Sequence, residues 1–71
     1  MATKAEAIHR AALDLVFGYA VKSSEGFRQW VYPNLPNDYS WSIALDDEIN
    51  AGVTAGKSAT QIAEAIYKTH S

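Results

Sequence analysis

The sequence predicts an all-α fold: a small bundle in which three main helices, at about 3–22, 40–55 and 58–69, pack with one short helix at about 24–32. Two observations support this prediction. Apolar residues recur at spacings of three and four along these segments, which is the period of a helix face. No segment alternates polar and apolar side chains as a half-buried strand does. We therefore expect one helical domain over residues 1–71.

The first predicted helix, residues 3–22, carries two apolar stripes. The first stripe has the spacing i, i+4, i+7, i+11 and comprises Ile8, Ala12, Leu15 and Tyr19. The second has the spacing i, i+4, i+8 and comprises Leu13, Phe17 and Val21. Together they make the second half of this helix apolar on nearly every side, so it is expected to be buried on more than one side. We expect either a central helix or self-association through Leu13, Phe17 and Val21.

A short helix and a loop follow. Ser23 or Ser24 can cap the helix at 24–32, because a serine oxygen accepts hydrogen bonds from the free N–H groups of a first turn. Pro33 ends it, since the residue before a proline is pushed out of the helical region. The next stretch, YPNLPND, has two prolines and two asparagines within seven residues. This composition predicts an ordered Pro-rich loop with Leu35 turned inward.

The third predicted helix starts near residues 38–40 and runs to about Ala55. Its apolar stripe repeats every four residues and comprises Trp41, Leu45, Ile49 and Val53. Gly56 is expected to close this helix in the left-handed conformation. The last helix then opens with Ser58-Ala59-Thr60-Gln61, which matches the S-x-x-Q form of the capping box.

Gly56-Lys57-Ser58 also matches the end of a phosphate-binding loop. That loop requires a first glycine at position 51, where this chain has Ala51, and a buried strand before it. The preceding residues instead have the period of a helix. We therefore interpret the glycine, lysine and serine as a helix end followed by a cap, which does not bind nucleotide.

Residues 41–71, WSIALDDEINAGVTAGKSATQIAEAIYKTHS, resemble the first two helices of homeodomain-like or Myb-like helix-turn-helix domains. The matching positions are Trp41, Leu45, Ile49, Gly56, Ser58, Ile62, Ala63, Ile66, Thr69 and Ser71. The resemblance implies two helices joined by a tight turn. In such domains a further, recognition helix enters the major groove. Here the sequence ends at Ser71, where that helix would begin, so the resemblance implies a scaffold whose recognition helix is absent.

Charge and composition exclude several classes of protein. Six Lys and Arg against eight Asp and Glu leave a net charge of -2, and no two basic residues are adjacent. Nucleic-acid binders concentrate basic residues on one face, so DNA is a weak candidate partner. The absence of cysteine excludes disulfides and thiolate metal sites. Glu6, His9, Arg10 and Asp14 interrupt the first helix, which argues against a signal peptide or membrane span. We expect a soluble, cytoplasmic protein.

The same reasoning predicts no enzyme, no cofactor and no metal site. His9 and His70 stand near opposite ends of the chain, and His70 is expected to fray. No nucleophile motif accompanies them. Asp46, Asp47 and Glu48 lack further ligands at the spacing a metal shell needs. They form either a solvated helix face or a docking patch for a basic partner.

Five of the eight aromatic residues fall between positions 27 and 41. Such a cluster can fill a small core, or it can form a binding surface, because Trp and Tyr are enriched in binding hot spots. We expect Trp41 to lie in the core. The expected surface patch, with its charged rim, comprises Trp30, Tyr32, Tyr39, Arg28 and Asp38.

The sequence therefore favours a small protein–protein interaction module that occludes or bridges a partner and can self-associate. Small, mildly acidic helical chains without cysteine are typical of phage-encoded or accessory bacterial modulators. Two alternatives stay open at this point. One is a regulator derived from a helix-turn-helix domain, which binds DNA or mimics a DNA-binding protein. The other is a structural subunit of a larger assembly.

Overall fold

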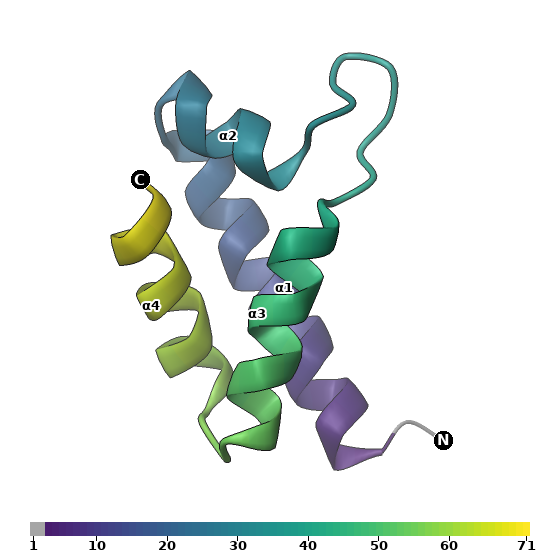
Figure 1. Ribbon diagram of the computed structural model, residues 1–71, viewed down its shortest axis with the longest axis vertical. Helices are drawn as coiled ribbons and strands as arrows, with labels where there is room; N and C mark the ends of the chain where they lie inside the picture. Colours follow the sequence, from purple (N-terminus) through teal and green to yellow (C-terminus); the bar gives the residue numbers. More distant parts are fainter. Residues whose placement is uncertain (1–2) are drawn as a thin grey trace.

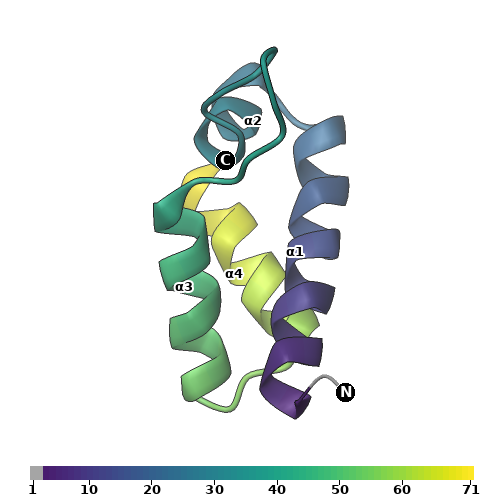
Figure 2. The ribbon, with the colours of Figure 1, turned by 90° about the vertical axis from the view of Figure 1, so that its right-hand side faces the viewer.

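A computed structural model describes residues 3–71 and confirms the all-helical fold (Figure 1). Its elements in chain order are α1 (Lys4–Lys22), α2 (Glu25–Val31), α3 (Ile43–Thr54) and α4 (Ala59–His70). Within residues 3–71, no residue belongs to a β-strand. α1 and α3 lie on opposite sides in Figure 2, α4 crosses obliquely between them, and α2 lies across one end. The core is therefore the space where α4 meets the other three helices.

α3 begins three residues later than the sequence predicts. Ser42 is its N-cap, and the Ser42 Oγ accepts a hydrogen bond of 3.1 Å from the Leu45 N–H. The backbone N–H of Ser42 donates to the Val31 carbonyl oxygen at 2.9 Å, which ties this residue to the end of α2 in an extended conformation. Trp41 therefore precedes the helix. The other helix ends differ from the predicted ones by at most one residue.

α1 packs on the core with a face that overlaps the first predicted stripe, since Ala12 is buried and Ile8 and Tyr19 pack against the core. Its buried residues are Ala12, Val16 and Ala20, spaced i, i+4, i+8. Two of the three are alanines, and such small side chains let α4 pack close to the α1 backbone. Phe17 and Val21 are left 44% and 57% exposed. The alternative of a central, enclosed helix is therefore wrong, and one side of α1 remains open.

The turn between α3 and α4 forms as the sequence predicts. Gly56 has φ 78°, the left-handed conformation. The Lys57 N–H donates to the Gly52 carbonyl oxygen, and the Gly56 N–H donates to that of Val53, both at 3.0 Å, which is the Schellman pattern. Because the turn follows the helix α3 and no strand precedes it, the phosphate-loop alternative is excluded.

A capping box starts α4 and allows a direct test. The Ser58 Oγ accepts from the Gln61 N–H at 3.2 Å, and Gln61 Oε1 accepts from the Ser58 N–H at 3.0 Å. Ser24 is the N-cap of α2, but its side chain makes no capping hydrogen bond. We expect Ser58→Ala to lower the free energy of unfolding by about 1 kcal/mol. Ser24→Ala is the matched control, and its urea midpoint should stay close to that of the wild type. Equal losses in the two variants would contradict this assignment.

Candidate functional site

A groove lies between the second half of α1, α2 and the segment 32–42. Its volume is about 250 Å³, and its lining residues are Phe17, Val21, Arg28, Tyr32, Leu35 and Tyr39. We call it the aromatic groove. The lining combines residues that the sequence assigned to two separate surfaces: Phe17 and Val21 to self-association, and Arg28, Tyr32 and Tyr39 to a partner patch.

Tyr32 forms the floor of the aromatic groove, so the prediction that it is exposed is wrong. Only 8% of Tyr32 is accessible. Its ring meets Phe17 edge-on with the centroids 5.9 Å apart, and Tyr39 in the same way at 5.5 Å. Both rings therefore help to cover Tyr32. Tyr39 itself is 67% exposed and Phe17 44%, so two aromatic walls face solvent above a buried floor.

Arg28 holds α1 and α2 together beside the groove. Its Nε donates to the Ala20 carbonyl oxygen at 3.3 Å, and its Nη2 donates to that of Ser23 at 3.1 Å. These carbonyls belong to the C-terminal end of α1, where a positive charge is favourable because the helix dipole is negative there. Arg28 therefore links the two helices that wall the groove, and it places a half-buried cation at the edge of the groove.

Burial raises the pKa of Tyr32 above its usual value of 10.0, and the nearby Tyr39 and Asp14 raise it further. The folded state therefore holds the phenolic proton more tightly than the unfolded chain does. This contribution to stability is complete below the unfolded pKa and is lost as the pH rises through the folded pKa. We expect thermal stability to fall above pH 10, and to fall less steeply in Tyr32→Phe, which keeps the ring. Thermal unfolding followed at a series of alkaline pH values measures this, and parallel curves for the two proteins would refute it.

The two tryptophans have the opposite surroundings from those predicted. Trp41 is 49% exposed, whereas Trp30 is half-buried and packs against the core. The Trp30 ring stacks on the imidazole of His70 with the centroids 3.8 Å apart and the planes inclined by 15°. This stack lies against the end of α4 and is not part of the groove lining. His70 is thus held in place by packing, contrary to the expectation that it frays.

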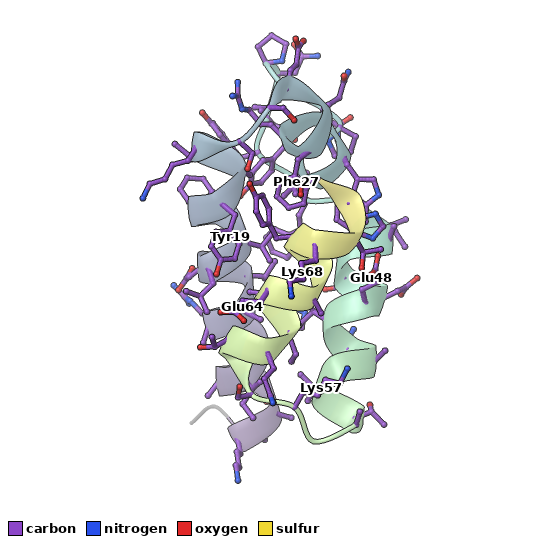
Figure 3. All side chains as sticks on the ribbon, turned by 90° about the vertical axis from the view of Figure 1, so that its left-hand side faces the viewer. Tyr19, Phe27, Glu48, Lys57, Glu64 and Lys68 are labelled. Carbon is purple, nitrogen blue, oxygen red and sulfur yellow. The ribbon has the colours of Figure 1, made fainter. Side chains whose placement is uncertain are left out.

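Two residues of the acidic triplet in α3 each contact a histidine on another helix. Asp46 Oδ1 lies 2.8 Å from the Nε2 of His9 on α1. Glu48, which projects from α3 beside the last turn of α4 (Figure 3), lies 2.6 Å from the Nε2 of His70. Of the three, Asp47 is exposed, and Asp46 and Glu48 are half-buried. Two members of the triplet therefore link α3 to its neighbours, and the alternative of a docking patch for a basic partner stays a prediction.

The helical period of the sequence was sufficient to predict that these two histidines lie on the core side of their helices. His9 stands three residues before Ala12, and His70 four residues after Ile66, so each extends the buried stripe of its own helix by one turn. Asp38, the last of the predicted site residues, accepts a hydrogen bond of 2.8 Å from the Ser40 N–H. Hydrogen bonds from Ser40 hold the pKa of this exposed carboxyl below its usual range.

Comparison of the chain with protein-family models, with curated proteins and with solved structures gives no match. Among residues 3–71, no three His, Cys, Asp or Glu side chains gather closely enough to hold a metal ion. Within the same part of the chain, no helix has both the length and the hydropathy needed to span a bilayer. The aromatic groove therefore has to be interpreted from its own residues.

Proposed function

We propose that this chain is a small, non-enzymatic protein–protein interaction module whose binding site is the aromatic groove. One observation carries the proposal: the rings of Phe17 and Tyr39 are 44% and 67% exposed beside the buried ring of Tyr32, with Arg28 in the same lining. Tyr and Arg are over-represented among the residues that dominate binding energy. Exposed apolar side chains that gather in one patch with a polar rim often mark an interaction site.

The dimensions of the groove favour side chains of a protein as its occupant. Pockets for small molecules usually have volumes of about 300–1,000 Å³ and enclose most of the ligand. This groove is smaller, at about 250 Å³, and it is open along one side. It suits one or two apolar side chains from a partner's surface, and Arg28 suits a neighbouring carboxylate.

Within this proposal, the three longer helices serve as the scaffold, and α2 with the Pro-rich segment 32–42 shapes the binding element. The protein acts by occluding or bridging its partner in the cytoplasm, as accessory modulators encoded by phages and bacteria do. Asp47, exposed on α3, adds a charge that attracts a basic partner.

The test places a photo-crosslinking amino acid at position 39 of the full chain, with position 64 as the control. Glu64 lies exposed on α4, on the face shown in Figure 3, and does not line the groove. The proposal expects a defined protein to be captured from position 39 and not from position 64. Tyr39→Ala should then lower retention of that same protein, and Glu64→Ala should not. Equal capture from both positions, or full retention by Tyr39→Ala, would refute the proposal.

The two alternatives remain predictions with their own tests. A regulator derived from a helix-turn-helix domain would use the α3–α4 hairpin, and its affinity for duplex DNA would fall steeply with rising salt. A structural subunit would form assemblies much larger than a dimer at micromolar concentration.

A further inference from the structure

The open side of α1, together with the N-cap Thr3, carries six residues at the spacing of a coiled-coil seam. They alternate by four and three positions and comprise Thr3, Ala7, Arg10, Asp14, Phe17 and Val21, all of them exposed. We call them the α1 seam. They lie on the side of the helix opposite the buried stripe of Ala12, Val16 and Ala20. A spacing of 4-3-4-3-4 keeps side chains on one face of a helix over several turns, which is what packing against a second helix requires.

The α1 seam is complementary to itself when two copies are antiparallel. Placing Thr3 opposite Val21 of a second copy also places Ala7 opposite Phe17 and Arg10 opposite Asp14, and the two-fold axis repeats each contact. The largest side chain thus faces one of the smallest, and the cation faces the anion. A parallel arrangement would instead place Arg10 on Arg10 and Asp14 on Asp14, which is repulsive.

Two features of the single chain agree with this pairing. A shallow hollow on α1, lined by Glu6, Ala7, Arg10, Ala11 and Asp14, lies where Phe17 of the second copy would enter. The ion pairs that the structure records among residues 3–71 both involve histidines, so neither Arg10 nor Asp14 is paired within the described chain.

We propose that the partner at this surface is a second copy of this chain, bound antiparallel along the α1 seam. The inference rests on the proposed function, because Phe17 and Val21 belong both to the seam and to the aromatic groove. The inference identifies a second copy of the chain as the partner that binds to that surface. A helix of 19 residues is roughly 28 Å long, so the contact is at the small end for a specific interface. The dimer is accordingly expected in the micromolar range.

The test exchanges the two charges of the seam, both on exposed residues. Asp14→Arg and Arg10→Asp should each put like charges against one another twice and weaken the dimer by on the order of tenfold or more. An equimolar mixture of the two variants should recover it, because every seam charge then meets its opposite. The double variant Arg10→Asp/Asp14→Arg should form the dimer without a second variant present, because each of its charges also faces its opposite. The readout is the mass by sedimentation equilibrium, which doubles from the 7.8 kDa of the single chain, with helical content checked by circular dichroism.

Orientation is tested with single cysteines, since the chain has none of its own. Ala11 lies beside the two-fold axis, so a short thiol linker should join two Ala11→Cys chains. In the antiparallel arrangement the two copies of position 7 lie about 15 Å apart along the helices, so Ala7→Cys should not be joined. Efficient linkage through position 7 would overturn the antiparallel arrangement.

Other outcomes also decide the matter. A wild type that stays at the mass of one chain at all concentrations would overturn the dimer, as would doubled mass in both single variants or a mixture that fails to associate. If the wild type is monomeric and Tyr39→Ala still abolishes capture of another protein, the dimer fails while the proposed function stands. If the dimer forms and the groove captures no other protein, the dimer stands while the proposed function fails.

Discussion

The Phe27→Ala variant is expected to be largely unfolded at 25 °C. Phe27 is 1% exposed, and its ring packs edge-on against Tyr67 with the centroids 5.2 Å apart and stacks on Trp30 at 6.2 Å. It thus joins α2 to the C-terminal half of α4. Truncating a buried phenylalanine costs about 3–5 kcal/mol, and a domain of this size is stabilised by roughly the same amount. The loss therefore matches the whole stability of the protein.

Circular dichroism and urea unfolding measure this effect. Phe27→Leu is the conservative variant, which should remain folded with a lowered midpoint because much of the buried volume is kept. Gln29→Ala, on the exposed side of the same helix, should behave as the wild type. Cooperative unfolding of Phe27→Ala at a near-native urea concentration would show that α2 contributes little to the fold.

Gly52→Ala is expected to destabilise the protein by about 1–3 kcal/mol, although alanine is the better helix former by about 1 kcal/mol. A Cβ at position 52 would lie 2.5 Å from Cγ1 and 3.0 Å from Cδ1 of Ile62. Ile62 is 2% exposed, and a β-branched side chain in a helix has essentially one rotamer at χ1. It cannot move aside, so α3 and α4 would have to separate.

Gly26→Ala is the matched control, because the nearest atom to a Cβ there is 4.0 Å away and belongs to a side chain. This variant should be neutral or slightly more stable. Truncating Ile62 should also relieve the clash, so the combined loss in Gly52→Ala/Ile62→Ala should be smaller than the sum of the single losses. Additive losses, or a stabilised Gly52→Ala, would mean that the two helices do not approach closely at this position.

Several of the features that were predicted correctly from the sequence depend on neighbouring residues only. The turn at Gly56 and the capping box from Ser58 to Gln61 are determined within a few residues, so their pattern was sufficient. The core face of α1 was predicted only in part, because the buried Val16 and Ala20 belong to neither predicted stripe. Its second half is apolar on nearly every side, and the selection of Ala12, Val16 and Ala20 depends on how closely α4 can approach. Periodicity carries no information on that distance.

The remaining errors concern contacts between elements distant in the chain. Trp30 was not recognised as the better-buried tryptophan because its partner, His70, lies on another helix forty residues away. The groove depends in the same way on the angle between α1 and α2. Two hydrogen bonds from Arg28 to carbonyls near the end of α1 join the two helices there. The sequence predicted Arg28, Tyr32 and Tyr39 together, but nothing in their spacing joins them to Phe17.

The stack of Trp30 on His70 also equips the protein with an internal optical probe. Trp30 is the indole that senses whether the last turn of α4 is docked, while Trp41, half in water, reports only on the segment before α3. In a Trp41→Phe background, the remaining tryptophan emission would come from the indole that stacks on the last turn of α4. Fraying at that end could then be timed separately from global unfolding, without any attached dye.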